Sequence, residues 1–179
     1  ERPINQHWSW DRILRSCFIK QADVLQGLFL FEDHFDLATL KNNFDFYEPR
    51  TVHESSLSPC IHVIQAAKLG YQEKAYELYL RTARLDLDDY NHEVHEGLHI
   101  TSMAGTWMAV VMGFGGMRVI DGLLSFAPML PKQWKGFSFT ICFKGAVIKV
   151  QVQDQKVDLV LLAGNPISVQ LFNEKIQLN

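Results

Sequence analysis

The spacing of hydrophobic positions divides the chain into two parts. Up to about residue 112, apolar residues recur every three or four positions, as they do along one face of a helix. This period predicts helices over residues 11–31, 58–70 and 71–87, joined by short connections. Helical hairpins of this kind indicate part of an all-helical array.

The second of these helices also carries the residues that favour helix ends. Ser58 suits the N-cap, Pro59 suits the first helical position, and Gly70 suits the left-handed site just past the last turn. Ile61 and Ile64 follow the helical period, so one face of this helix is expected to be buried.

Beyond Gly113 the period changes to two, which is the pattern of half-buried strands. Alternate positions are apolar in two neighbouring runs: Phe137, Phe139, Ile141 and Phe143, then Ile148, Val150 and Val152. The pairs Asp121-Gly122 and Lys144-Gly145 are typical of hairpin turns. Five or six short strands predict a β-sandwich. We therefore assign residues 1–112 to a helical domain and residues 113–179 to a β-sandwich domain, either whole or truncated.

The composition excludes several classes of protein. The 179 residues are 47% hydrophobic and 21% charged, with a net charge of −3, so the charge balance favours neither nucleic acid nor an anionic membrane as partner. No apolar run reaches the roughly 18 residues of a transmembrane helix. Three widely spaced cysteines disfavour a disulfide framework and favour a cytoplasmic location. The chain opens without methionine, in a polar segment typical of the interior of a longer protein.

The stretch HEGLH at residues 95–99 matches the zinc-protease pattern, in which two histidines on one helical face bind the metal. A catalytic zinc also needs a third protein ligand. No histidine follows this pair, the next glutamate along the chain is Glu174, and Asp121 belongs to a predicted turn. The sequence therefore predicts no metal site, and His95 and His99 need another explanation.

Several polar side chains lie where a structural role explains them poorly. Lys20 and Gln21 interrupt an apolar predicted helix, although a solvated helix edge would also account for them. The loop before the helix at 58–70 is rich in polar residues: Arg50, His53, Glu54, Ser55, Ser56 and Ser58. Small and hydroxyl residues recur in HITSMAGTW, at residues 99–107. Free N–H groups and the dipole at a helix start favour phosphate, so these two segments are candidates for an anion site.

Long segments of the chain resemble the family 65 glycoside phosphorylases, namely residues 8–33, 53–70, 85–107 and 113–134. The resemblance implies that the helical domain is the last part of an (α/α)6 catalytic barrel and that a C-terminal β-sandwich follows it. It favours the members that act on maltose. Such an enzyme is expected to be a homodimer without a cofactor, and to convert maltose and phosphate into β-glucose 1-phosphate and glucose with inversion.

The resemblance also implies roles for individual residues. Lys20 and Gln21 match positions that bind the sugar. The positions expected to receive phosphate are Ser55, Ser56, His99, Gly105 and Thr106, with Gly105 and Thr106 in a turn. No segment matches the family's general-acid glutamate, which lies upstream. The chain by itself is therefore expected to be inactive.

Other functions remain open at this point. Kojibiose phosphorylase, trehalose phosphorylase and an α-glucoside hydrolase of the same family differ in loops that lie upstream of this chain. A non-enzymatic carbohydrate-binding module would carry exposed aromatic residues along one sheet face, whereas Phe137, Phe139 and Phe143 alternate as core residues. The zinc protease is the third alternative.

Overall fold

The computed structural model describes residue 4 and residues 7–53, 55–89 and 92–179. The chain forms two compact units, Glu1–Ala109 and Val110–Asn179. The boundary that we expected after residue 112 falls inside a π-helix, Ala109–Phe114. Within the described residues, no helix is both long and apolar enough to cross a membrane.

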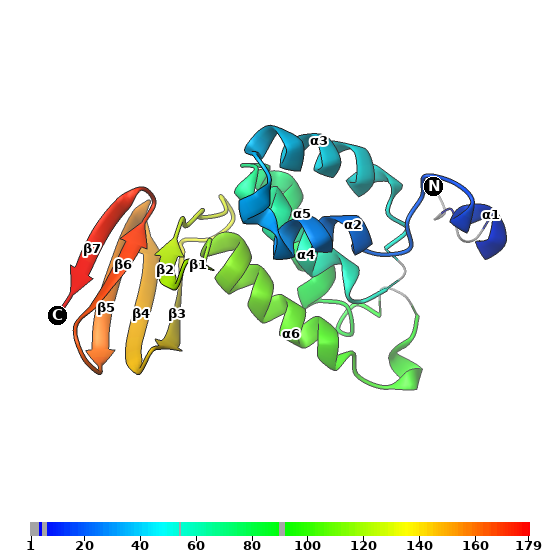
Figure 1. Cartoon of the computed structure of the whole chain (residues 1–179). Coiled ribbons are helices and arrows are strands. Elements are labelled where there is room, and N and C mark those ends of the chain that lie inside the picture. The colour runs from blue at the N-terminus through cyan, green and yellow to red at the C-terminus, as the bar shows by residue number, and fades with distance from the viewer. Residues whose placement is uncertain (1–3, 5–6, 54, 90–91) are drawn as a thin grey trace. The chain divides into compact units, whose positions relative to one another are not determined.

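The first unit is helical (Figure 1). Its α-helices are α1 (Trp10–Leu14), α2 (Asp23–Leu30), α3 (Leu37–Tyr47), α4 (Ser58–Lys68), α5 (Gln72–Ala83) and α6 (Ile100–Met108). Short 3₁₀ turns are η2 (Glu32–His34), η3 (Glu48–Arg50) and η4 (Val94–Glu96). The helical part of the sequence prediction is confirmed, whereas the (α/α)6 barrel stays a prediction.

Helix α4 forms the centre of this unit. Every residue from Ser58 to Ala67 is buried, because α2, α3, α5 and α6 all pack against the helix. Gly70 follows it with φ +76°, the left-handed conformation expected at that site. The N-cap prediction was wrong: Leu57 is the N-cap residue, and Ser58 is the first helical residue with a fully buried side chain.

The single helix predicted over residues 11–31 is also wrong, because the chain forms α1 and α2 with an irregular segment of turns and bends between them. In that segment Ile19 pairs with Thr51 in a parallel β-bridge. The Ile19 N–H donates to the Arg50 carbonyl at 3.0 Å, and the Ile19 carbonyl accepts from the Val52 N–H at 2.8 Å. A partner distant in the sequence therefore satisfies backbone groups that a helix would otherwise have bonded within itself.

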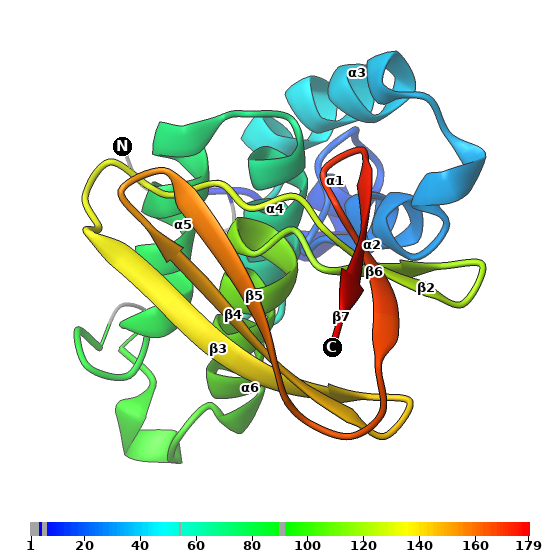
Figure 2. The ribbon, with the colours of Figure 1, turned by 90° about the vertical axis from the view of Figure 1, so that its left-hand side faces the viewer.

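The second unit consists of two β-sheets (Figure 2). Its strands are β1 (Arg118–Ile120), β2 (Leu123–Phe126), β3 (Gly136–Phe143), β4 (Ala146–Gln153), β5 (Lys156–Ala163), β6 (Ile167–Leu171) and β7 (Glu174–Leu178). One sheet has the order β1-β2-β6-β7 and the other has the order β3-β4-β5. The pair β2–β6 is parallel, and the remaining pairs are antiparallel.

Both predicted hairpin turns are confirmed. Asp121 and Gly122 have φ values of 49° and 72°, and Lys144 and Gly145 have φ values of 50° and 81°. Two successive positive φ values define the turn type whose twist matches that of the flanking strands.

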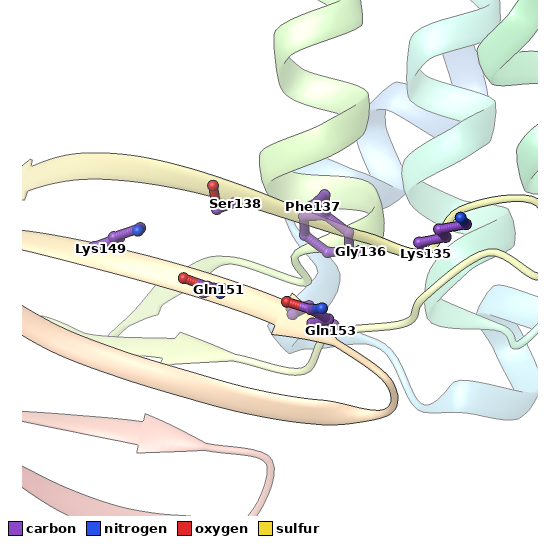
Figure 3. A pocket seen from close by; sticks show the side chains of 8 residues that line it. Lys135, Gly136, Phe137, Ser138, Lys149, Gln151 and Gln153 are labelled. Carbon is purple, nitrogen blue, oxygen red and sulfur yellow. The ribbon is translucent and has the colours of Figure 1, made fainter.

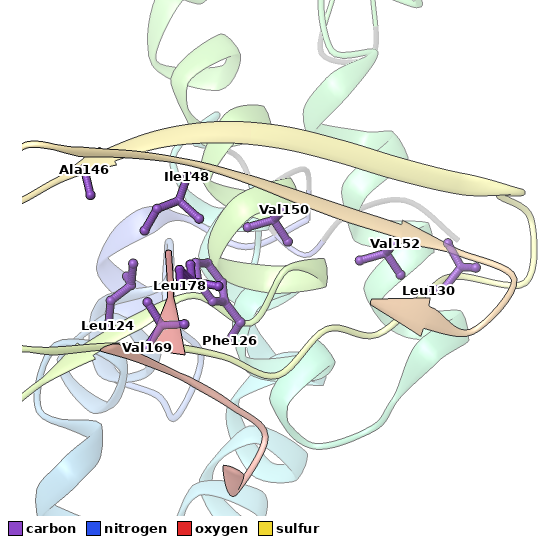
Figure 4. Packing of buried hydrophobic residues seen from close by; sticks show 9 residues of the cluster. All are labelled: Leu124, Phe126, Leu130, Ala146, Ile148, Val150, Val152, Val169 and Leu178. Atoms are coloured by element: carbon purple, nitrogen blue, oxygen red, sulfur yellow. The ribbon is translucent and has the colours of Figure 1, made fainter. Parts of the chain in front are cut away.

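The core of the second unit lies between the two sheets. Side chains of β4 point toward those of β2, β6 and β7 (Figure 4). The buried cluster comprises Leu124, Phe126, Leu130, Ala146, Ile148, Val150, Val152, Val169 and Leu178. The predicted alternation of Phe137, Phe139, Ile141 and Phe143 is confirmed, because these residues pack against that cluster. The unit is thus a sandwich of two sheets around one core.

Candidate functional site

His99 is the N-cap residue of α6 and is held by a carboxylate from the connection after α5. Asp86 Oδ1 lies 2.6 Å from His99 Nδ1, and Asp86 Oδ2 accepts a hydrogen bond from the His99 backbone N–H at 2.9 Å. One carboxylate therefore fixes both the main chain and the ring of His99. The hydrogen bond to Asp86 raises the pKa of His99, and the two bonds from His99 lower the pKa of Asp86.

A second carboxylate approaches the other ring nitrogen of His99. Glu93 Oε2 lies 3.5 Å from His99 Nε2, and 37% of the Glu93 side chain is exposed. The imidazole thus lies between two carboxylates, both of which favour its protonated form. A positively charged imidazole at the start of a helix is suited to binding an anion.

The HEGLH stretch does not form the helix that the zinc-protease pattern requires. Residues Val94–Glu96 form a 3₁₀ turn, Gly97 has φ +120°, and His99 starts α6. His95 and His99 therefore do not lie on one helical face. His95 is mostly exposed, and His99 Nδ1 is engaged by Asp86.

The second candidate segment, which contains Ser55 and Ser56 and which we call the serine loop, precedes α4. Ser55 Oγ accepts a hydrogen bond from the Leu57 N–H at 3.3 Å, and the Ser55 carbonyl accepts from the Ser58 N–H at 3.1 Å. Ser55 and Ser56 are partly exposed. Glu54, which belongs to the same polar loop, lies outside the described residues. The two hydroxyl groups thus lie at the surface, in the turn that leads into the central helix.

Beneath this loop lies a buried pair of histidines. The His53 and His62 ring centroids are 4.5 Å apart, His53 Nδ1 lies 2.9 Å from Ser58 Oγ, and His62 Nδ1 donates to the Ser58 carbonyl at 2.9 Å. Burial, reinforced by the charges of Arg81 and Lys74, lowers the pKa of His53 to about 2 and that of His62 to about 4. Both rings are therefore neutral at pH 7.

Arg81 connects helix α5 to His53, because its Nη2 donates a hydrogen bond to the His53 carbonyl at 2.8 Å. His53 itself has φ +55°, a left-handed conformation uncommon for a residue with a side chain. Its Nε2 is buried and has no hydrogen-bond partner among the residues that the structure describes. The backbone just before the serine loop is thus held by packing and by Arg81, in a conformation that the residue itself does not favour.

Gly105 and Thr106 lie within α6, so the turn predicted for them is wrong. Gly105 is buried against Cys60 of α4, and the Thr106 hydroxyl donates to the Ser102 carbonyl at 2.9 Å. The helix continues through them because their backbone groups can form ordinary helical bonds. What looked like a small-residue turn is a site of close helix packing.

The fold brings some of the predicted phosphate residues into one region. Contact between Cys60 and Gly105 places the start of α4, which follows Ser55 and Ser56, next to the middle of α6. His99 lies at the start of α6, seven residues and therefore about 10 Å along the helix axis from Thr106. His99 and Thr106 thus lie at different levels of the same helix.

Lys20 and Gln21 lie in the irregular segment between α1 and α2, just after the bridge formed by Ile19. Lys20 is exposed, with its Nζ 5.1 Å from the centroid of the Trp10 ring. Gln21 is partly exposed, and its Nε2 donates to Asp23 Oδ1 at 3.4 Å. Both polar groups therefore belong to a surface segment and not to an apolar helix.

Two pockets lie away from these residues. In the second unit, a shallow hollow of about 450 Å³ lies on the outer face of β3 and β4 and is lined by polar groups that include Ser138, Lys149 and Gln151 (Figure 3). In the first unit, an apolar hollow lies along α2 and η2 and is lined by residues that include Leu28, Phe31 and Phe35. Neither hollow contains a predicted site residue.

Asp86 and His62 were not identified as site residues from the sequence, and His53 was noted only as a member of the polar loop before α4. Asp86 is thirteen residues from His99, at the end of the helix predicted over residues 71–87, where an acidic side chain is typical of a solvated position. His62 lies among apolar residues of α4, and this sequence context indicates an ordinary core position. One signal was available in the sequence: five histidines lie in or near the two segments proposed for the anion, namely His53, His62, His92, His95 and His99.

The matches to known families cover both units. Residues 1–108 match the glycosyl hydrolase family 65 central catalytic domain, and residues 117–178 match the C-terminal domain of the same family. Maltose phosphorylase of Bacillus subtilis (strain 168) is 56% identical over 99% of this chain and 24% of its own length. Alpha,alpha-trehalose phosphorylase of Thermoanaerobacter brockii is 49% identical over 98% of this chain and 23% of its own length.

A solved structure shows the same fold. The putative kojibiose phosphorylase from human microbiome superposes with a TM-score of 0.91 at 42% identity, over 99% of this chain and 26% of that chain. The chain thus spans about a quarter of the length of the relatives that it matches. With both units matched by its domains, the chain belongs to glycosyl hydrolase family 65.

Proposed function

We propose that this chain is the C-terminal part of a maltose phosphorylase, which converts maltose and phosphate into β-glucose 1-phosphate and glucose. Similarity over nearly the whole chain to the phosphorylase of Bacillus subtilis supports this assignment. The single structural observation that supports it best is His99, an imidazole at the start of α6 that Asp86 holds and whose pKa the hydrogen bond to Asp86 raises. Phosphate is the substrate that such a group would bind.

The proposed chemistry explains why a hydroxyl-rich anion site replaces a second catalytic carboxylate. An inverting glycosidase uses one carboxylic acid to protonate the leaving oxygen and one carboxylate to activate water. In a phosphorylase, phosphate is itself the anionic nucleophile, so the protein has to hold it in line with the anomeric carbon. Ser55, Ser56 and the His99 imidazole are groups that donate hydrogen bonds to phosphate oxygens.

The remaining parts of the reaction belong to the rest of the proposed enzyme. The general-acid glutamate is expected upstream, in the part of an (α/α)6 barrel that precedes these helices. Lys20 and Gln21 are assigned to the sugar, and Gly105 and Thr106 to the neighbourhood of the phosphate. We expect a cytoplasmic homodimer that needs no cofactor.

Two alternatives within the family keep the same site. Trehalose and kojibiose phosphorylases are similar to this chain over nearly its whole length, and they would differ from a maltose phosphorylase in the sugar acceptor. A non-enzymatic carbohydrate-binding module is disfavoured, because the outward positions of β3, β4 and β5 include Ser138, Lys149 and Asp158 but no aromatic residue.

Product analysis of the complete parent enzyme tests the proposal. The enzyme should release β-glucose 1-phosphate from maltose only when phosphate is present, and kojibiose and trehalose should react more slowly. Faster phosphorolysis of trehalose or kojibiose would show that the proposed substrate is wrong but that the proposed reaction, phosphorolysis, is right. Hydrolysis of maltose without phosphate would reject the reaction itself.

A further inference from the structure

We propose that Asp86 and Glu93 control phosphate binding at His99 in opposite directions: Asp86 positions the imidazole, and Glu93 occupies the place of the phosphate until phosphate displaces it. This inference rests on the proposed function, because it assigns phosphate as the anion that His99 binds. It adds two residues to the proposed phosphate site, both of which contact His99.

The first step concerns the orientation of the ring. Asp86 uses its two oxygens on two donors of the same residue, Nδ1 at 2.6 Å and the backbone N–H at 2.9 Å. The ring is thereby fixed relative to the first turn of α6, and Nδ1 is no longer available to a ligand. Nε2 is the one donor of this ring left for an anion, and Asp86 determines where it points.

The second step concerns the space at Nε2. Glu93 Oε2 lies 3.5 Å from this nitrogen, farther than an ordinary hydrogen bond and close enough for attraction between charges. A phosphate oxygen bound to Nε2 would lie beside the Glu93 carboxylate, and the like charges would repel each other. Glu93 is partly exposed, so a carboxylate displaced by phosphate would meet solvent.

The charge of the ring depends on these same two residues. Asp86, from the connection after α5, and Glu93, next to η4, are the groups whose charges raise the pKa of His99. The raised pKa keeps the imidazole protonated to a higher pH than that of an ordinary histidine. Replacement of Asp86 should therefore change the orientation of the His99 ring and also reduce the fraction of rings that are protonated.

The experiment uses the complete parent enzyme and inorganic phosphate. Phosphate binding is measured by calorimetry without sugar, and KM for phosphate and KM for the disaccharide are measured from pH 5.5 to 8.5. The variants are Asp86→Asn and Glu93→Gln. The matched controls are Asp88→Asn, an exposed neighbour paired with Arg84, and Glu96→Gln, an exposed residue of η4.

At pH 6, Asp86→Asn should weaken phosphate binding roughly tenfold, the size expected when a charged hydrogen bond is misplaced. The rise of KM for phosphate with pH should also begin at lower pH in this variant. Phosphate itself titrates in the same way in experiments with every variant. A difference between variants in the pH at which KM for phosphate rises therefore reports on His99. At the same pH, Glu93→Gln should strengthen phosphate binding several-fold, and KM for the disaccharide should change little in either variant.

Asp86→Glu provides a second variant in case Asp86→Asn does not fold. It keeps the charge but displaces the carboxylate, so it should weaken phosphate binding while keeping the pH profile of the unsubstituted enzyme. The inference is overturned if Asp86 and Glu93 variants shift phosphate binding in the same direction, or if they behave like the controls. Failure of the proposed function is seen separately, because the unsubstituted parent would then bind no phosphate.

Discussion

Gly105 of α6 lies so close to Cys60 of α4 that a Cβ atom added at Gly105 would come within 2.9 Å of the Cys60 Cβ. The two helices can approach to this distance because one of them carries no side chain at the contact. Cys60 lies near the start of α4, so this contact determines where the serine loop stands along α6.

The first prediction follows from that contact. Gly105→Ala should destabilise the protein by about 1–3 kcal/mol, since overpacking forces the two helices apart. Gly27→Ala is the matched control: Gly27 is also helical, but nothing lies within 4 Å of an added Cβ. It should stabilise the protein by about 0.5–1 kcal/mol. Urea unfolding of both variants checks this, and a stable Gly105→Ala variant would contradict the described contact.

The second prediction concerns pH. Burial lowers the pKa of His62 in the folded protein from the ordinary value of 6.5 to about 4. The unfolded state therefore binds the proton more tightly. The stability that depends on a neutral His62 is present above about pH 6.5 and is lost as the pH falls toward 4. His62 should by itself lower the free energy of unfolding by roughly 1–3 kcal/mol over that window, and His53, whose pKa is lowered to about 2, should add to the loss.

His62→Asn tests whether His62 causes this loss. The asparagine amide can still donate to the Ser58 carbonyl, but it does not titrate, so the variant should lose less stability between pH 6.5 and 4.5 than the unsubstituted protein. His34→Asn, at an exposed position, should leave the pH dependence unchanged. Equal pH dependence in the His62 variant and the unsubstituted protein would assign the effect to other groups.

The third prediction concerns phosphate in the complete parent enzyme. Ser55→Ala and His99→Ala should each weaken phosphate binding by roughly 1.5–3 kcal/mol, because each removes a hydrogen bond to a charged group. KM for maltose should change less. Ser138→Ala, on the exposed face of β3, serves as control. Normal phosphate dependence with reduced maltose affinity would show that these residues were assigned to the wrong substrate.

The fourth prediction concerns the sugar. Gln21 lies on a surface segment with its amide only weakly bonded to Asp23, so it can reorient toward a ligand. Gln21→Ala in the parent enzyme should raise KM for maltose several-fold and leave KM for phosphate unchanged. Gln26→Ala, at an exposed position of α2, should change neither constant. A change in phosphate dependence alone would contradict the assignment of Gln21.

The fifth prediction concerns the chain by itself. It should show no phosphorolysis of maltose, because no segment matches the general-acid motif. It should also associate in solution, since Ile100, Met103 and Trp107 expose an apolar face of α6 at 67%, 48% and 52%. Trp107→Arg should reduce this association in sedimentation experiments more than Leu87→Gln does. Phosphate-dependent glucose release by the pure chain would disprove the first part.

The sequence by itself determined the features that depend on neighbouring residues. The alternation of Phe137, Phe139, Ile141 and Phe143 predicted which side of β3 faces the core, because a strand turns successive side chains to opposite faces. Asp121-Gly122 and Lys144-Gly145 predicted their turns, because glycine, and to a lesser extent aspartate, tolerates positive φ. Long resembling segments also identified the family, which the domain matches confirmed.

Only the tertiary structure decided where distant groups meet. The helix predicted through Lys20 and Gln21 gives way to a bridge with Thr51, because a partner far along the chain offers the backbone other hydrogen bonds. Asp86 reaches His99 only because α5 and α6 pack against each other. Local patterns carry no information about such pairs, since burial and charge at one residue depend on which segments the fold brings next to it.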